Sequence, residues 1–221
     1  VDRMLAVVAV RDPEPRLDQL ERLLGIAEAN GVPPVVVVNK VDLADGPGFV
    51  ERVREIDRVP GYPVLAVSAE SGEGLDELGR LLAEGTSALV GPSGVGKSSL
   101  LNALAPELDL RTGELSRKLR RGRHTTVTSR LLTLPSGGLV ADTPGFGDVG
   151  VWGVPVDEVE GCFPEIRERS AGCRFRGCTH LSEPGCAVLS AVEAGDIPSS
   201  RWESYAALRR AAAEEGARRG G

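Results

Sequence analysis

Residues 91–98 have the composition and spacing of a phosphate-binding loop. They read Gly-Pro-Ser-Gly-Val-Gly-Lys-Ser and match the pattern G-x-x-x-x-G-K-[ST], with Ser99 directly after. Glycines in such a loop let several backbone N–H groups point at a phosphate near the start of a helix. Lys97 can reach the β- and γ-phosphates of a nucleoside triphosphate, and the Ser98 hydroxyl can ligate Mg²⁺. A chance glycine-rich turn, the alternative, leaves unexplained the apolar run before the loop and the helical pattern after it.

Seven consecutive residues are therefore predicted to hold the phosphates of a nucleotide: Ser93, Gly94, Val95, Gly96, Lys97, Ser98 and Ser99. Ser98 is the predicted Mg²⁺ ligand among them. Lys97 is also a candidate catalytic residue, because a lysine at this place can stabilise charge on a phosphoryl group during transfer.

A second polar motif follows an apolar, β-branched run at 34–38. It reads Asn39-Lys40-Val41-Asp42, and loops at the carboxyl ends of parallel strands are where α/β folds bind ligands. The Asp42 carboxylate can accept hydrogen bonds from N1–H and the 2-amino group of guanine, a donor pair that adenine lacks. Asn39 can bridge the base to neighbouring loops, and the Lys40 stem can pack along the ring face. Alone, this motif could be an ordinary polar loop.

Ser68 and Ala69 follow the next predicted strand, at residues 63–67. A backbone N–H at this place can donate a hydrogen bond to O6 of guanine. In isolation the pair is weak evidence, and a helix N-cap near Ser71 is an alternative interpretation. Together with the motif at 39–42, the pair predicts a guanine-binding site.

Basic residues cluster between 111 and 130, in a stretch with little apolar periodicity. Only one acidic residue, Glu114, accompanies Arg111, Arg117, Lys118, Arg120, Arg121, Arg123 and Arg130. A long loop of this kind in a compact domain is usually functional, and its charge suits RNA phosphates. Near its end, Thr126 is the predicted second Mg²⁺ ligand, with Thr125 as the alternative. A solvated basic loop with no specific role is the competing interpretation.

Asp142 ends an apolar strand predicted at 138–141 and begins the sequence Asp-Thr-Pro-Gly. An aspartate in this position can hold Mg²⁺ through water, and the N–H of Gly145 can contact a γ-phosphate and respond to its loss. The same four residues also make a good Asp-initiated turn. The phosphate-binding loop earlier in the chain favours the nucleotide role.

Three cysteines and a histidine lie close together late in the chain. Cys173, Cys178, His180 and Cys186 fall within fourteen residues and include one of only two histidines. Three thiolates and an imidazole are a complete tetrahedral set for Zn²⁺. Since four protein ligands leave no open position, we predict one structural zinc ion per chain. Unrelated buried thiols are the alternative, and Cys162, outside the cluster, is interpreted as a packing residue.

The elements that must position these residues alternate between strands and helices. Strands are expected at 5–10, 34–38, 63–67 and 87–90, and helices at 14–30, 49–57, 97–105 and through Leu75, Leu78 and Leu82. This alternation predicts an α/β fold with a parallel sheet. A hairpin at 131–134 and 138–141 is expected next, followed by helices at 187–194 and 200–218.

Length and composition fit one domain of about 150 residues with a smaller one behind it. The chain has 221 residues, of which 41% are hydrophobic, and a formal net charge of −6. No apolar run reaches the roughly 18 residues that a membrane span needs. No signal peptide is visible, so we expect a cytoplasmic protein with no membrane contact.

The motifs occur in the order N-K-x-D, S-A, phosphate-binding loop, threonine loop and D-T-P-G. Ras-like GTPases begin with the phosphate-binding loop, so this chain looks circularly permuted, with the motif order G4-G5-G1-G2-G3. With the Cys/His spacing at 173–186 behind these motifs, nearly all of the 221 residues resemble the ribosome small-subunit-dependent GTPase family RsgA, also called YjeQ.

The resemblance implies a circularly permuted Ras-like GTPase domain at 1–152 and a small helical zinc-binding domain at 153–221. That family also carries an N-terminal OB-fold, which we expect this chain to lack because no such strands precede Val1. The implied activity is hydrolysis of GTP to GDP with Mg²⁺, stimulated by the small ribosomal subunit late in its maturation. The implied partners are that subunit and its rRNA, and we expect a monomer.

One departure from Ras-like catalysis bears on mechanism. Phe146 stands where Ras-like proteins carry the glutamine that orients the attacking water, so we expect a slow intrinsic rate. His124 is our candidate for the water-orienting catalytic residue, positioned when rRNA orders its loop. A phosphate-contacting or solvent-facing histidine is the alternative.

Two other functions fit part of the sequence. A P-loop kinase acting on a small molecule would need an acceptor pocket and has no use for the motif at 39–42. An RNA-binding zinc protein that keeps GTP as a structural ligand would bind GTP tightly without turnover.

Overall fold

The computed structural model describes residues 1–58, 60–110, 130–142 and 154–219. Its centre is a six-stranded sheet with the strand order β3-β2-β1-β4-β6-β5. The strands are β1 (Arg3–Ala9), β2 (Pro34–Asn39), β3 (Val64–Ala66), β4 (Thr86–Val90), β5 (Arg130–Thr133) and β6 (Leu139–Asp142). All neighbours pair in parallel except β5, which runs antiparallel to β6. The expected α/β fold and the hairpin are both confirmed.

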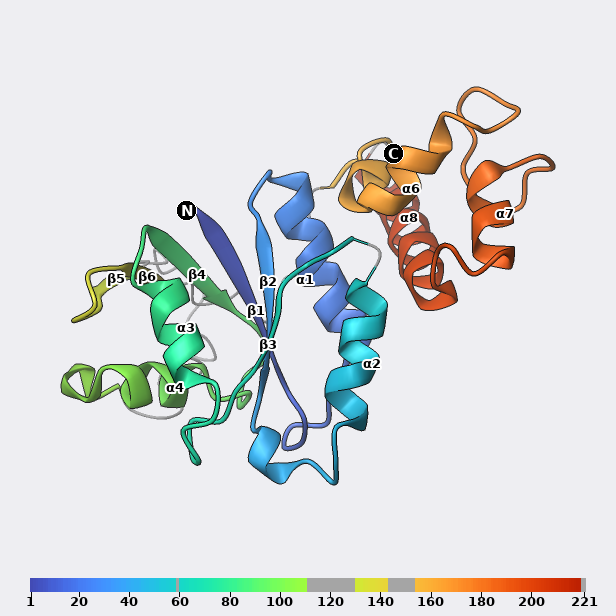
Figure 1. Ribbon diagram of the computed structural model, residues 1–221. Coiled ribbons are helices and arrows are strands. Elements are labelled where there is room, and N and C mark those ends of the chain that lie inside the picture. The colour runs from blue at the N-terminus through green and yellow to red at the C-terminus, as the bar shows by residue number, and fades with distance from the viewer. Residues whose placement is uncertain (59, 111–129, 143–153, 220–221) are drawn as a thin grey trace.

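Helices cover both faces of the sheet (Figure 1). One face carries α1 (Leu17–Ala29) and α2 (Gly48–Asp57), and the other carries α3 (Leu75–Leu82) and α4 (Lys97–Leu104). Side chains of β1 alternate between these faces: Leu5, Val7 and Ala9 belong to the core with α3 and α4, whereas Met4, Ala6 and Val8 belong to the core with α1 and α2. This two-sided burial explains why β2 is a continuous valine run, as in other parallel sheets.

One local prediction is wrong. Helix α3 begins at Leu75 after Gly74, and no side-chain hydrogen bond caps it. Ser71 is therefore not an N-cap; its backbone N–H instead donates to Ser68 Oγ at 3.0 Å.

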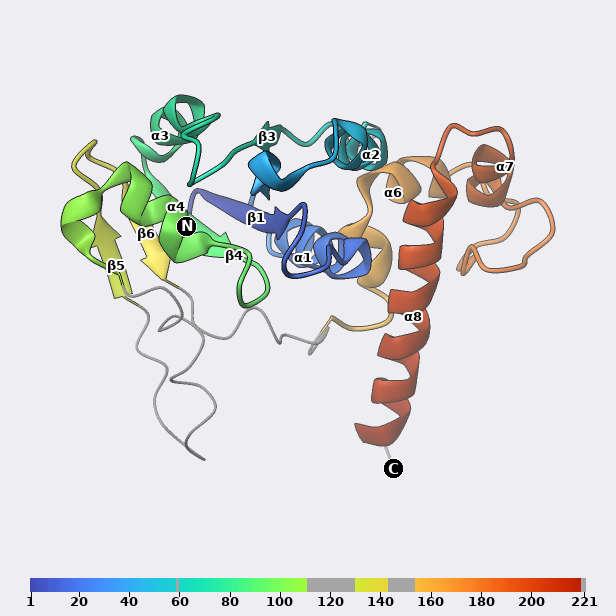
Figure 2. The ribbon, with the colours of Figure 1, turned by 90° about the horizontal axis from the view of Figure 1, so that it is seen from below.

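Residues 154–219 form a helical segment beside α1, at the end of the molecule opposite β5 (Figures 1 and 2). It contains a 3-10 turn (Val159–Cys162), α6 (Pro164–Ser170), α7 (Ala187–Glu193) and α8 (Ser199–Arg219). Its core includes Cys162, Phe163 and Tyr205, and the two rings meet edge to face at 5.6 Å. The packing role expected of Cys162 is confirmed, because the residue is fully buried. None of the described helices is long and apolar enough to cross a membrane.

Buried charges join α1 to this helical segment. Arg201 of α8 is fully buried, and its Nε donates to Glu165 Oε1 at 2.6 Å. Glu21 of α1 is almost fully buried as well. Burial opposes the charge of Arg201, but the attraction of Glu165 and Glu21 outweighs it and raises the Arg201 pKa. Close by, a Cβ added to Gly25 would lie 3.4 Å from Cys162 Cβ, so α1 packs tightly here.

This cluster predicts a large loss of stability for Arg201→Ala. The substitution leaves the Glu165 carboxylate buried without its cation, and breaking a buried ion pair in this way costs about 3–5 kcal/mol. Urea denaturation followed by circular dichroism measures the change. Arg210→Ala, at an exposed position of the same helix, is the matched control and should shift the free energy of unfolding by less than about 0.5 kcal/mol. Equal stability of the two variants would contradict the predicted role of the cluster.

Candidate functional site

Three loops meet at the carboxyl ends of the parallel strands, at the lower edge of the sheet in Figure 1. They follow β2, β3 and β4, and they contain the motifs at 39–42, 68–69 and 91–98. Since β1 pairs with both β2 and β4, the first and third loops lie on either side of the end of β1. The structure thus brings together the segments predicted to contact a base and phosphates.

The phosphate-binding loop has the backbone geometry that only glycine allows at two points. Gly91 has φ +148°, and a Cβ added there would lie 2.3 Å from Val7 O. Gly96 has φ +94°, and a Cβ there would lie 2.3 Å from Asn39 Nδ2. The missing Cβ atoms thus let the loop pack closely against β1 at Gly91 and against Asn39 at Gly96. These contacts fix the position of the loop that is predicted to hold the phosphates.

Lys97 and Ser98 begin α4 directly after this loop. The Lys97 ammonium lies over the loop, where it donates to Gly91 O at 2.6 Å and Pro92 O at 2.9 Å. The Ser98 side chain is buried in the first turn of the helix. Both residues lie at the positive end of the helix dipole, which attracts anions; their contacts with phosphate and Mg²⁺ stay predictions.

Asn39 connects the loop at 39–42, called the base loop because of its predicted role, to the phosphate-binding loop at 91–98, called the phosphate loop. It is almost fully buried, and its Nδ2 donates to Val95 O at 2.8 Å. Its Oδ1 is buried and makes no hydrogen bond to the described residues, so a ligand that brings a donor would satisfy it. Lys40 follows in the left-handed conformation, with φ +63°, and its Nζ donates to Asp12 O. The lysine stem thus runs from the loop at 39–42 past the phosphate-binding loop, where its Cε would lie 3.8 Å from a Cβ added to Gly96.

Ser68 links the two guanine motifs through its side chain. The hydroxyl donates to Asp42 Oδ1 at 2.5 Å and accepts from the backbone N–H groups of Glu70 and Ser71 at 3.1 and 3.0 Å. One oxygen of the Asp42 carboxylate is thereby fixed in position, while an ionised carboxylate offers about four acceptor sites. The sequence pattern predicted contacts only from the backbone of Ser68 and Ala69, whereas the serine side chain also orients Asp42.

Several predicted site residues lie outside the described part of the chain. They are His124, Thr125, Thr126, Gly145 and, with them, Phe146. The backbone of Asp142 is described: it ends β6 and pairs in register with Leu89 of β4, one residue before the end of that strand. The aspartate therefore ends its strand beside the strand that enters the phosphate-binding loop.

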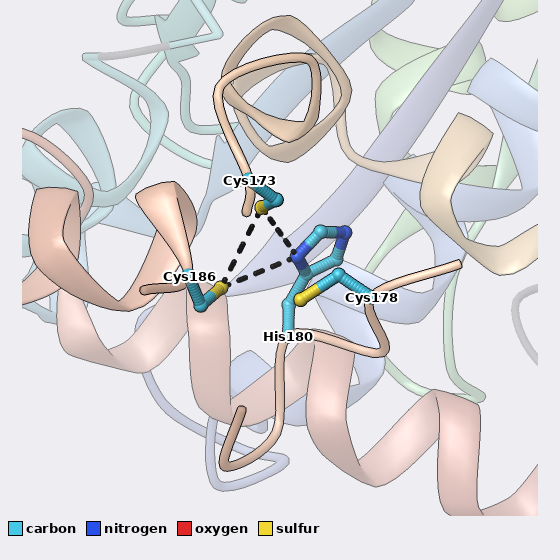
Figure 3. Close-up of side chains that lie close together, drawn as sticks. All are labelled: Cys173, Cys178, His180 and Cys186. Carbon is cyan, nitrogen blue, oxygen red and sulfur yellow. Dashed lines mark hydrogen bonds between the residues drawn. The ribbon is translucent and has the colours of Figure 1, made fainter. Parts of the chain in front are cut away.

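The predicted zinc ligands converge in the helical segment (Figure 3). Ligand atoms of Cys173, Cys178, His180 and Cys186 all lie within 4.8 Å of one another. Cys173 Sγ and Cys186 Sγ are 3.8 Å apart, and His180 Nδ1 lies 3.5 and 3.4 Å from them. A tetrahedron with ordinary Zn–S and Zn–N bond lengths has edges of about 3.8 Å between sulfurs and about 3.5 Å between sulfur and nitrogen. The donor set and its spacing fit Zn²⁺.

Neighbouring groups hold the histidine of this cluster in one orientation. His180 Nε2 lies 3.2 Å from Glu160 Oε2, which leaves Nδ1 to face the sulfurs. Such a carboxylate behind a ligating histidine is the usual arrangement in zinc sites. The backbone carbonyl of His180 accepts a hydrogen bond from Trp202 Nε1 at 2.8 Å, which ties the ligand loop to α8. Sequence reasoning missed Glu160, because nothing in its spacing connects it to the cluster.

Glu183 stabilises the loop between the last two ligands. Its carboxylate accepts hydrogen bonds from the backbone N–H groups of Thr179, Leu181 and Ser182. Burial alone would raise the pKa of Glu183, but the bonds from the Thr179 hydroxyl and these N–H groups outweigh it and hold the pKa well below its usual range. This role was not predicted, because a single glutamate between two predicted ligands has no distinctive sequence pattern.

The sheet is mostly parallel, and the two loops with the guanine motifs come before the phosphate-binding loop in the chain. This combination defines a circularly permuted P-loop GTPase. Residues 1–152 match the family model described as RsgA GTPase. The chain belongs to the RsgA GTPase family and is a GTP hydrolase.

Known proteins agree with this assignment along most of the chain. A protein of Gemmatimonas aurantiaca, named small ribosomal subunit biogenesis GTPase RsgA, is 49% identical over 95% of this chain and 68% of its own length. The crystal structure of YjeQ from Thermotoga maritima matches with a TM-score of 0.80 and 36% identity, over 96% of this chain and 71% of the other. That of YloQ, described as a circularly permuted GTPase, matches at 0.78 and 33%, over 97% and 69%. Membership of a GTPase family argues against the small-molecule kinase alternative.

The Ser68–Asp42 contact predicts a loss of guanine nucleotide affinity in Ser68→Ala. Removing the hydroxyl frees the Asp42 carboxylate to rotate, and a hydrogen bond of this kind contributes about 1–2 kcal/mol, or roughly 5- to 30-fold in Kd. Titration with a fluorescent GDP analogue measures the effect. Ser71→Ala, a nearby serine that does not contact Asp42, is the control; an equal loss in both variants would show that Ser68 acts only by shaping the loop.

The Cys/His cluster predicts about one zinc ion per chain, measured by elemental analysis of the purified protein. Cys178→Ala should abolish stable zinc binding, because three remaining ligands leave the tetrahedron incomplete. Cys162→Ala removes a thiol that lies outside the cluster and should retain the metal. Zinc retained at full stoichiometry in Cys178→Ala would exclude this cysteine as a ligand.

Proposed function

We propose that this GTPase acts in biogenesis of the small ribosomal subunit and hydrolyses GTP faster when the subunit is bound. The single observation that supports this best is the 49% identity, over 95% of the chain, to a relative named for that role. The Cys/His cluster behind the GTPase motifs adds to it, because it supplies a second unit that could contact the subunit while the first binds nucleotide. We assign the nucleotide role to residues 1–152 and the zinc-binding role to residues 153–221.

The proposed nucleotide contacts follow from the geometry of the three loops. Asp42 and Asn39 read guanine, with Ser68 and Ala69 beside them, and residues 93–99 hold the phosphates. Mg²⁺ neutralises charge on the β- and γ-phosphates during hydrolysis. Ser98 and Thr126 are its proposed protein ligands, and Asp142 holds it through water. Most of the rate enhancement then comes from positioning and charge stabilisation, to which Lys97 contributes.

The proposed partner surface includes the basic stretch at 111–130. This stretch contains seven basic residues, although the whole chain has a net charge of −6. Such a local concentration of positive charge suits contact with rRNA phosphates. His124 lies in this stretch, and we propose that it orients the attacking water when rRNA is bound. The protein is proposed to act as a cytoplasmic monomer.

The test is GTP hydrolysis by the full chain with and without purified small subunits. We expect slow turnover alone and strong stimulation by subunits, with no turnover in Lys97→Ala, which lacks the cation at the phosphates. His124→Ala should keep the slow basal rate and lose most of the stimulation. Tight GTP binding without any turnover would instead favour GTP as a structural ligand, and full stimulation of His124→Ala would remove the role proposed for that histidine.

A further inference from the structure

The loop between Cys173 and Cys178 exposes an arginine on each side of a phenylalanine. Arg174, Phe175 and Arg176 are all exposed, and Phe175 is 47% accessible to solvent. Phe175 is the most exposed of the aromatic side chains in the described ranges. A single exposed apolar residue is common on protein surfaces. This one differs because an arginine flanks it on each side and because its loop lies between two of the predicted zinc ligands.

One hydrogen bond and one glycine turn shape the backbone of this tip, defined as residues 174–176. Arg174 N donates to Gly185 O at 3.0 Å, so the tip is joined to the loop that carries Cys186. Gly177, with φ +72°, turns the chain back toward Cys178. In Figures 1 and 2 the segment between α6 and α7 lies at the edge of the molecule farthest from the sheet. The tip is thus presented outward on a preorganised loop, which lowers the entropic cost of binding a partner.

The side chains of the tip suit an unpaired nucleotide. The Arg174 guanidinium carbon lies 5.4 Å from the centre of the Phe175 ring, close enough for a cation–π interaction. An aromatic face with neighbouring guanidinium groups is what proteins use to stack a base and contact its phosphates. Bases in a duplex are already stacked on each other and cannot use the ring. An acidic peptide could use the arginines but would gain little from the phenylalanine.

We propose that residues 174–176 form a contact site for single-stranded RNA, in which Phe175 stacks on an unpaired base while Arg174 and Arg176 bind the adjoining phosphates. The proposal rests on the proposed function, because the small subunit is the source of such RNA. It adds a second RNA-binding surface to the basic stretch at 111–130, on the other part of the chain.

The first experiment measures binding of the zinc-loaded full chain to a fluorescent oligouridylate of about eight nucleotides, by anisotropy. Phe175→Ala should raise the Kd roughly 5- to 150-fold, the range that corresponds to loss of one stacked base. Phe175→Tyr keeps a stacking face and should bind like the unmodified chain. Arg174→Ala and Arg176→Ala should each reduce the slope of log affinity against log salt by about 0.7. Arg218→Ala, at a side chain that is 80% exposed on α8, controls for loss of charge alone.

Unchanged binding by Phe175→Ala would overturn the proposal, even if the arginine variants bind more weakly, since the contact would then be electrostatic only. Equal competition by polyglutamate and by oligouridylate would overturn it in favour of an acidic partner.

A second experiment separates this proposal from the proposed function. If the subunits stimulate hydrolysis and Phe175→Ala raises the subunit concentration needed for half-maximal stimulation, the tip contacts subunit RNA. If stimulation is intact and that concentration does not change, the tip proposal fails for the subunit while the proposed function stands. If subunits never stimulate the unmodified chain, the proposed function fails, and the oligouridylate measurements still decide whether the tip binds RNA.

Discussion

A buried hydrogen bond from Asn39 Nδ2 to Val95 O, 2.8 Å long, holds the base loop against the phosphate loop. The two residues are far apart in the chain, but β1 lies between their strands and brings them to the same edge of the sheet. Gly96 must be a glycine because Asn39 occupies the space beside it. The spacing between these two loops is therefore set by contacts across the sheet. Contacts of this kind do not depend on the order in which the chain visits the strands, so a permuted chain can build the same site.

The strands could be predicted from the sequence because strands of a parallel sheet are buried on both faces and therefore form continuous apolar runs. The valine run of β2 is buried on both faces, and its continuity is visible without knowing the fold. The same holds for the spacing of the Cys/His cluster, whose ligand atoms the structure brings within 4.8 Å. In both cases the physical requirement acts on residues that are close in the chain.

Features that depend on distant partners were not predicted. Helix α6 was not predicted because Ile166 is its only large apolar side chain, whereas α7, of the same seven-residue length, carries several. Glu160 carries no pattern of its own, and its role behind His180 exists only in three dimensions. The same is true of the Ser68 hydroxyl, which bonds an aspartate 26 residues away. Arg201 would be expected on the surface from its charge, yet the pairing with Glu165 allows complete burial.

Helix α1 contacts both functional parts of the molecule. Its first turns line a cavity of about 150 Å³ together with Pro92, Ser93 and Val95 of the phosphate-binding loop. Farther along, Gly25 packs on Cys162, and Glu21 acts on the buried Arg201. The zinc-ligand loop in turn is tied to α8 through the Trp202–His180 hydrogen bond. Helix α1 thus connects the phosphate-binding loop to the helical segment through direct contacts. These contacts act in addition to the polypeptide chain that joins the two parts.

That shared helix also has a consequence for synthesis. Glu21 is translated about 180 residues before Arg201, an interval of roughly 10–40 s at typical elongation rates. During this time α1 can pack on the valine-rich strand β2 that follows it, but the side that α8 covers in the finished protein stays exposed to solvent. The nascent chain therefore exposes a helix surface that contains apolar side chains and Glu21 until Arg201 of α8 has been synthesised. Slower translation between α1 and α8 would lengthen the period in which chaperones or proteases can reach this surface.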